Sequence, residues 1–213
     1  MNFEEEKIKL VNKLKREGRI YSKEIELAFL RINRELFIPK SQERYAYVDS
    51  PLQIGEGQTI SAPHMVAIMC EKLDIKKGQK ILEIGSGSGY HSAIVSEIVG
   101  KKGHVYTIER FSSLAKFAKK NLEKAKIDNV TVEVGDGSEG LPNYAPYSRI
   151  YVTCASPDIP PPLIDQIKDK GKILIPVGKM ICELQLIIKN KEKLSIKNLG
   201  GCAFVPLIGK YGH

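Results

Sequence analysis

The chain has 213 residues, of which 42% are apolar, and this is enough to bury the core of one domain. Its first 20 residues are rich in charge and no later apolar run reaches the ~20 residues of a membrane span, so we expect a cytoplasmic protein with no membrane partner. The net charge of +8 is compatible with a nucleic acid, an anionic substrate or a charged surface, but the 33 basic residues are interspersed with 25 acidic ones, which favours the charged surface.

Residues 1–60 are predicted to hold two helices and a long loop. Apolar residues at helical spacing predict a first helix that Gly18 ends and a second helix that begins after Ser22. From Pro39 to Ser61 no period persists, and proline and glycine recur, which predicts an ordered loop of about 20 residues. A loop of this length in a compact domain is often functional.

Residues 61–180 are predicted to alternate short apolar strands with helices, and Ser61 is a candidate cap for the first of these helices. The expected strands are 80–84, 105–108, 130–134, 149–153 and 172–176, and the expected helices are 63–73, 89–99, 114–124 and 162–168. This alternation predicts a mostly parallel, doubly wound α/β sheet. Residues 181–213 offer two more strands, 182–189 and one around 203–206, with no helix between them, which predicts an antiparallel edge. We expect one domain over residues 1–213.

The first strand of this core, 80–84, leads directly into a glycine-rich loop. Alternate glycines permit a tight turn and a close backbone approach to a ligand. The loop departs from the G-x-G-x-x-G pattern of dinucleotide sites because Tyr90 takes the sixth position and Glu83 precedes the first glycine. A carboxylate there suits the sulfonium and ammonium groups of S-adenosylmethionine and would oppose a pyrophosphate. The loop residues expected to contact such a cofactor are Gly85, Ser86, Gly87, Ser88 and Gly89.

The next two strands also end in residues suited to a nucleoside. Glu109, followed by Arg110, ends the second strand, and its carboxylate can accept hydrogen bonds from both ribose hydroxyls. The third strand ends in Asp136 and Gly137, where the carboxylate can accept from an adenine amino group. Each feature alone is compatible with a solvated acid or an ordinary turn. Their recurrence after successive strands indicates one shared ligand.

From about residue 20 to residue 209 the chain resembles the protein-L-isoaspartate O-methyltransferase family. The most specific motifs are AYVDSPL at 46–52, IGEGQTISAPHM at 54–65, LEIGSGSGY at 82–90, GDG at 135–137, APY at 145–147, IPPPLIDQIK at 159–168 and FVPLIG at 204–209. The resemblance implies a Rossmann-like methyltransferase core with S-adenosyl-L-methionine as cofactor. It also implies methylation of the free α-carboxylate of L-isoaspartyl residues in damaged proteins and peptides, which starts repair through a succinimide.

The resemblance assigns roles to three further segments. The segment from Gln58 through Thr59 and Ile60 to Ser61, followed by His64, would lie across the cofactor and the acceptor carboxylate. Ser61 matches the active-site serine, and we expect Thr59 and Ser61 to hold the carboxylate by their hydroxyls. Asp49 is expected to order this loop. The substrate peptide would be held by the segment Val205, Pro206 and Leu207.

The sequence departs from the family pattern at a few positions. Cys154 and Ser156 stand where small alanines are usual, Cys182 replaces a common glutamine, and little chain follows Gly209. The four cysteines are too widely spaced for a zinc motif, so we expect free thiols and no metal.

A carboxylate acceptor is already ionised at neutral pH, so the transfer requires alignment and no general base. One alternative is a transfer RNA adenine methyltransferase of related core, which the positive charge favours. The segment at 159–163 lacks the amide or carboxylate before the prolines that this chemistry uses. The other alternative is a binding module without catalysis, against which the intact candidate residues argue. We expect isoaspartyl proteins as partners, no nucleic acid, and a monomer.

Overall fold

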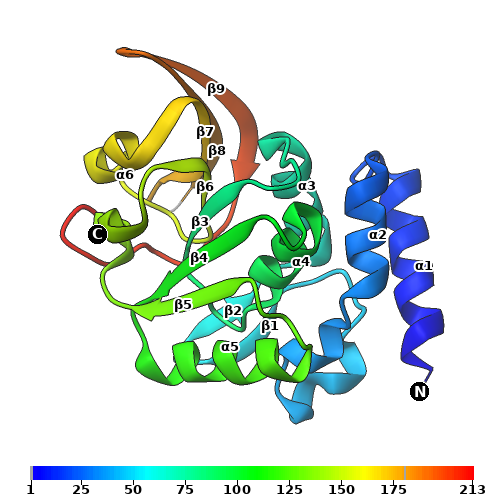
Figure 1. Ribbon diagram of the computed structural model, residues 1–213. Helices are drawn as coiled ribbons and strands as arrows, with labels where there is room; N and C mark the ends of the chain where they lie inside the picture. Colours follow the sequence, from blue (N-terminus) through cyan, green and yellow to red (C-terminus); the bar gives the residue numbers. More distant parts are fainter. Residues whose placement is uncertain (1, 180) are drawn as a thin grey trace.

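The computed structural model describes residues 2–179 and 181–213. Its main sheet has seven strands in the order β5-β4-β3-β6-β7-β8-β9 (Figure 1). These strands are β3 (Lys80–Ile84), β4 (His104–Glu109), β5 (Val130–Val134), β6 (Tyr147–Val152), β7 (Ile167–Gly178), β8 (Cys182–Asn190) and β9 (Lys193–Cys202). Neighbours from β5 through β7 are parallel, and β8 and β9 are added antiparallel. The predicted doubly wound sheet with an antiparallel edge is confirmed.

Both faces of the sheet are covered, because successive residues of its central strands belong to two separate apolar clusters. Ile81 packs with the helices of one face, whereas its neighbour Leu82 packs on the other face with Leu163. The first face carries α3 (Pro63–Leu73), α4 (Tyr90–Val99) and α5 (Ser112–Lys124), and the second carries α6 (Pro161–Gln166).

Two N-terminal helices add a further layer outside α4. They are α1 (Phe3–Arg16) and α2 (Lys23–Arg31), which lie side by side in Figure 1, with α2 between α1 and α4. Gly18, at a φ of 66°, follows the end of α1 as predicted. Ser22 stands at the N-cap of α2, but its hydroxyl donates to Glu71 at 2.5 Å instead of capping the helix. No helix of the described residues has the length and apolar character needed to cross a bilayer.

The prediction of an irregular loop from Pro39 to Ser61 was incomplete. The segment contains the 3-10 helix η2 (Lys40–Tyr45) and an antiparallel hairpin of β1 (Leu52–Gly55) and β2 (Gln58–Ile60). Glycines and a glutamate with positive φ make the turn, and the strands are too short to show a period in the sequence. A second 3-10 helix, η1 (Arg34–Phe37), precedes η2.

The prediction of Ser61 as the cap of α3 was wrong. The N-cap residue is Ala62, which has no capping side chain, and the carboxylate of Asp49 accepts the backbone N–H of His64 in the first turn at 2.9 Å. A cap supplied from outside the helix leaves no local signal in the sequence.

The strand expected around residues 203–206 was also misplaced. The structure has β9 at Lys193–Cys202, and Pro206 makes only an isolated parallel bridge to Ala155. β9 is exposed along most of its length, so the alternation that marks a half-buried strand is missing from its sequence. Its pairing with β8 holds it in the sheet.

Candidate functional site

A cavity opens beyond the carboxyl ends of β3, β4 and β6, where ligands bind in open α/β sheets. Its empty volume, counting the mouth that is open to solvent, is about 770 Å³. The lining includes most of the residues predicted from the sequence: Gln58, Thr59, Ile60, Ser61, Glu83, Gly85, Ser86, Gly87, Ser88, Glu109, Arg110, Gly137, Val205, Pro206 and Leu207. Three predicted residues, Gly89, Asp136 and His64, lie outside this lining.

The glycine loop after β3 has no room for a side chain at Gly85. Gly85 has a φ of 93°, and a Cβ built on it would lie 2.4 Å from Oγ1 of Thr153. Gly137, on the neighbouring turn, leaves 2.5 Å between such a Cβ and the side chain of Ile84. The two glycines therefore let these turns pack closely against neighbouring side chains while their backbones line the cavity.

Glu109 is fixed at the end of β4 by two hydrogen bonds. Its side chain is buried, with Oε2 accepting the N–H of Gly87 at 2.9 Å and Oε1 accepting the N–H of Phe111 at 3.1 Å. Each carboxylate oxygen can accept a second hydrogen bond, so the fixed carboxylate retains capacity for two ribose hydroxyls. Arg110 is exposed beside it, with its guanidinium 4.5 Å from the centre of the Phe111 ring.

Glu83 lies fully buried at the inner end of the cavity. Its Oε2 accepts the hydroxyl of Thr107 at 2.6 Å, and Thr107 lies 2.7 Å from the hydroxyl of Ser86. Burial raises the pKa of Glu83 to about 8, although the hydrogen bond from the Thr107 hydroxyl opposes this effect. The other oxygen, Oε1, has no hydrogen-bond partner among residues 2–179 and 181–213.

Two buried residues beside Glu83 were missed in the sequence. Nδ1 of His91 and the hydroxyl of Tyr151 also lack partners in the described part of the chain, and their rings lie 4.3 Å apart. Burial lowers the pKa of His91 to about 3, so its imidazole is neutral at pH 7. Buried polar atoms without a partner need a polar ligand or water. His91 and Tyr151 are recognised only in the folded structure, because nothing local in the sequence marks them.

Asp136 is built into the turn that follows β5. Its Oδ1 accepts from the amide and hydroxyl of Ser138, at 2.8 and 2.7 Å, and its Oδ2 accepts the N–H of Lys210 at 2.7 Å. Burial alone would raise the pKa of Asp136, but these hydrogen bonds lower it below its ordinary value. The contact with adenine therefore stays a prediction, while the carboxylate joins the turn to the C-terminal segment.

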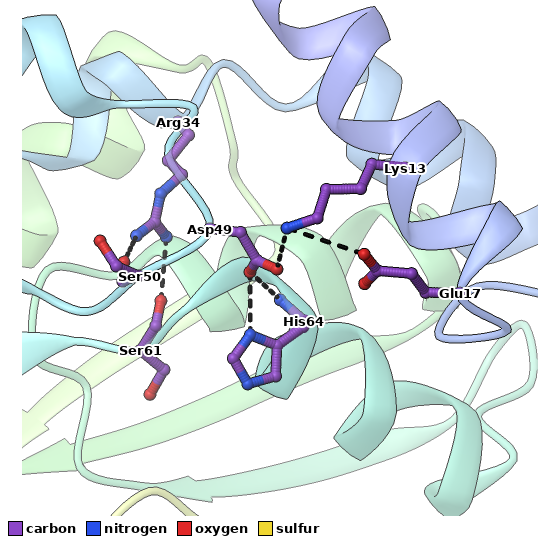
Figure 2. Close-up of polar contacts among 7 residues, drawn as sticks. All are labelled: Lys13, Glu17, Arg34, Asp49, Ser50, Ser61 and His64. Atoms are coloured by element: carbon purple, nitrogen blue, oxygen red, sulfur yellow. Dashed lines mark hydrogen bonds and ion pairs between the residues drawn. The ribbon is translucent and has the colours of Figure 1, made fainter.

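The hydroxyls of Thr59 and Ser61, on and just after β2, form no hydrogen bonds with the described residues, which leaves them free for a ligand. The backbone of Ser61 is fixed by Arg34, which donates from Nη1 to the Ser61 carbonyl at 3.1 Å and from Nη2 to the Ser50 carbonyl at 3.4 Å (Figure 2). Arg34 is fully buried, with its guanidinium 4.9 Å from the centre of the Tyr90 ring. Arg34 was not predicted from the sequence, because it stands between Asn33 and Glu35 and nothing local marks it as buried.

Asp49 makes a second set of contacts at the base of this hairpin. Its Oδ1 lies 2.9 Å from both the backbone nitrogen and the ring Nδ1 of His64, and its Oδ2 accepts from Nζ of Lys13 on α1 at 3.2 Å (Figure 2). Burial alone would raise the pKa of Asp49, but the hydrogen bonds from His64 and Lys13 lower it below its ordinary value. The expectation that Asp49 orders the loop agrees with these contacts.

The segment Val205–Leu207 forms another part of the cavity wall. The carbonyl of Val205 accepts the N–H of Ala155 at 2.7 Å, and the N–H of Leu207 donates to the Ala155 carbonyl at 2.7 Å. Cys154 lies beside this bridge, and burial raises the pKa of its thiol well above the ordinary range. A protonated, buried thiol is a poor nucleophile, which argues against attack on a nucleobase. Within the described residues no cluster of histidine, cysteine and carboxylate side chains could hold a metal.

Comparison with known proteins agrees with this geometry. Residues 5–212 match the model of the family described as protein-L-isoaspartate(D-aspartate) O-methyltransferase (PCMT). The protein-L-isoaspartate O-methyltransferase of Hyperthermus butylicus is 52% identical over 99% of this chain and 91% of its own, and that of Methanothermobacter thermautotrophicus is 51% identical over 98% and 97%.

Two solved structures are similar over almost the whole chain. A protein-L-isoaspartate O-methyltransferase superposes with a TM-score of 0.90 at 34% identity, covering 97% of this chain and 67% of that one. A putative family member from Plasmodium falciparum, in complex with S-adenosyl-L-homocysteine, gives 0.85 at 26% identity over 98% of this chain and 99% of its own. The chain belongs to the protein-L-isoaspartate(D-aspartate) O-methyltransferase family.

Proposed function

We propose that this protein transfers a methyl group from S-adenosyl-L-methionine to the free α-carboxylate of L-isoaspartyl residues in damaged proteins and peptides. The observation that carries the proposal is one cavity, in a chain that matches this family over residues 5–212, with the glycine loop and Glu109 on one side and the free hydroxyls of Thr59 and Ser61 on another. The methyl ester would close to a succinimide, whose hydrolysis returns some normal aspartyl linkages.

The residues of the cavity fit this cofactor. The unpaired Oε1 of Glu83 is placed to accept from an ammonium group, and Glu109 retains two acceptor positions for ribose hydroxyls. Gly85 and Gly137 line the cavity with backbone alone, because a Cβ at either position would clash with Thr153 or Ile84. When bound, the cofactor supplies an electrophilic methyl group on a sulfonium.

On the acceptor side the protein has to align a charge that already exists. An α-carboxylate with an ordinary pKa of about 3.5 is ionised at neutral pH, so no proton has to be removed. The hydroxyls of Thr59 and Ser61 donate hydrogen bonds to this carboxylate and hold it in line with the methyl group. Because a hydroxyl does not neutralise the carboxylate, its nucleophilic charge is retained.

The remaining assignments concern the setting of the reaction. We propose that the protein acts as a cytoplasmic monomer on damaged proteins, without nucleic acid or membrane partners. The interspersed charges and four free cysteines support this, since a reducing compartment keeps thiols unpaired.

A three-substrate assay tests the proposed function. Labelled S-adenosylmethionine is offered with an isoaspartyl peptide, with the same peptide carrying aspartate, and with bulk transfer RNA. We expect label only on the isoaspartyl peptide, in a form that mild base releases, because a methyl ester is hydrolysed by base. Base-stable label on the RNA would instead support the transfer RNA methyltransferase.

A further inference from the structure

We propose that Asp49 is a positioning residue that holds His64 as the Nδ1–H tautomer, so that the bare Nε2 of His64 accepts the N–H of the isoaspartyl residue itself. This inference rests on the proposed function and deepens it, because it assigns a residue that tells an isoaspartyl site from a normal aspartyl site.

The geometry fixes the ring of His64 at two points. Oδ1 of Asp49 lies 2.9 Å from both the backbone nitrogen and Nδ1 of His64, so the ring is tied to the first turn of its own helix. A carboxylate can only accept, and therefore Nδ1 must carry the proton. Lys13 holds the second carboxylate oxygen at 3.2 Å and keeps Asp49 ionised and oriented.

Exposure leaves the imidazole of His64 accessible to a peptide. The side chain of Asp49 is 9% exposed whereas that of His64 is 37% exposed, so solvent and substrate reach the imidazole but not its partner. His64 lies outside the cofactor cavity yet follows Ser61 by three residues. In Figure 2 the ring edge with Nε2 is turned away from Asp49, on the side to which the Ser61 hydroxyl also points.

The chemistry of the substrate selects the group that Nε2 binds. An unprotonated nitrogen repels the acceptor carboxylate and attracts an N–H donor. In an isoaspartyl residue the free carboxylate and the residue's own N–H are attached to the same carbon. In a normal aspartyl residue one more carbon separates them. A fixed acceptor beside Ser61 therefore discriminates between the isomers by position, where charge cannot.

The tautomer is tested first, by long-range 1H–15N correlation of the histidine rings at about pH 9, where an imidazole is ordinarily neutral. We expect the His64 ring of the wild type to carry its proton on Nδ1. Asp49→Asn, whose side chain can both donate and accept, should populate the Nε2–H form as well. Glu17→Gln is the matched control, because Glu17 is an exposed partner of the same Lys13 at 3.8 Å and should leave the tautomer unchanged. A wild-type ring protonated on Nε2 would overturn the inference.

The contact between the peptide N–H and His64 is tested by removing first the donor and then the acceptor. An isoaspartyl peptide methylated on the isoaspartyl nitrogen should raise KM about tenfold with the wild type, and Asp49→Asn should do the same with the unmodified peptide. The two changes together should cost no more than either alone, because they remove one interaction. Independent, multiplying effects would refute the contact. His64→Gln provides the same comparison in a variant that keeps Asp49.

A cofactor measurement separates this result from general damage to the site. The affinity for S-adenosylhomocysteine, measured by calorimetry, should stay within about twofold in Asp49→Asn, because neither Asp49 nor His64 lines the cofactor cavity. A parallel loss of cofactor affinity would contradict the positioning role. If the wild type methylates no isoaspartyl peptide, both the proposed function and the contact are refuted. If the enzyme is active but its His64 ring carries the proton on Nε2, only this inference is refuted.

Discussion

The hydroxyl of Ser61 is free, and Asp49 caps the helix that follows it. A serine before an apolar helix ordinarily caps it, because its side-chain oxygen accepts hydrogen bonds from the amides of the first turn. Here the carboxylate of Asp49 accepts the N–H of His64, and Arg34 fixes the Ser61 backbone through its carbonyl. The two roles that the sequence left open for Ser61 are therefore separated in the structure, with capping assigned to Asp49.

This separation makes Ser61→Ala an informative change. We expect turnover to fall by about tenfold or more, since a hydrogen bond to a charged group is lost. The free energy of unfolding should change by less than about 0.5 kcal/mol, because no helix cap is removed. Turnover is measured with saturating isoaspartyl peptide and stability by urea unfolding. A loss of about 1 kcal/mol with normal turnover would restore the capping role.

Glu83 gives the cofactor-free protein an unusual pH dependence. Its pKa is about 8 in the folded protein against 4.5 ordinarily, so the folded state binds a proton more tightly than the unfolded chain does. The stabilisation from this proton is fully present below pH 4.5 and is lost as pH rises through about 8. This is the reverse of the usual carboxylate, whose pKa falls on folding.

The comparison with Glu83→Gln isolates this effect, because glutamine resembles the protonated acid at every pH. We expect the free energy of unfolding of the wild type to fall relative to the variant between about pH 5 and pH 8, by on the order of a few kcal/mol. Urea unfolding across this range measures the difference. A constant difference would show that Glu83 does not bind a proton preferentially in the folded state.

At the scale of elements, the glycine loop after β3 depends on both its backbone angles and its neighbours. Gly85 combines a positive φ with a predicted clash against Thr153, whereas Gly78, at a φ of 77°, has open space where its Cβ would lie. Gly78→Ala should therefore cost about 1 kcal/mol for its angle alone. Gly85→Ala should cost about 1 to 3 kcal/mol more and weaken cofactor binding. Urea unfolding and calorimetry with S-adenosylhomocysteine check both values, and equal costs would rule out the clash.

The elements that the sequence predicts well are those whose signal is local. The strands β3, β4 and β5 are short segments rich in apolar residues, and each ends in, or is directly followed by, glycine or a carboxylate, so these strands and the cofactor side of the cavity were predictable. The hairpin of β1 and β2 and the exposed strand β9 exist because of partners elsewhere in the chain. No window of the sequence contains that information.

The candidate site divides in the same way. Glu109 and Gly137 follow strand ends and were found from their positions. Arg34, which holds two carbonyls, and the Asp49 contact to Lys13 join segments far apart in the chain. Family resemblance supplied Thr59 and Ser61, but their geometry required the folded hairpin.

At the scale of the whole molecule, the N-terminal helices contribute one contact to the acceptor side of the site. α1 packs on α2, and α2 packs on α4, so these helices form an outer layer. Lys13 nevertheless extends from α1 to Asp49, which contacts the start of α3. The outer layer therefore stabilises the acceptor side of the cavity, while the sheet holds its cofactor side.

The strand order also has a consequence for how the chain folds. One edge of β3 pairs with β4, the next strand along the chain. The other edge pairs with β6, a strand much later in the sequence, with Ile81 opposite Arg149. Until β6 arrives, the strand that bears the cofactor loop has an open backbone edge, and closing so long a loop is slow. We therefore expect that a chain lacking β6 exposes this unpaired edge of β3, a feature that favours aggregation.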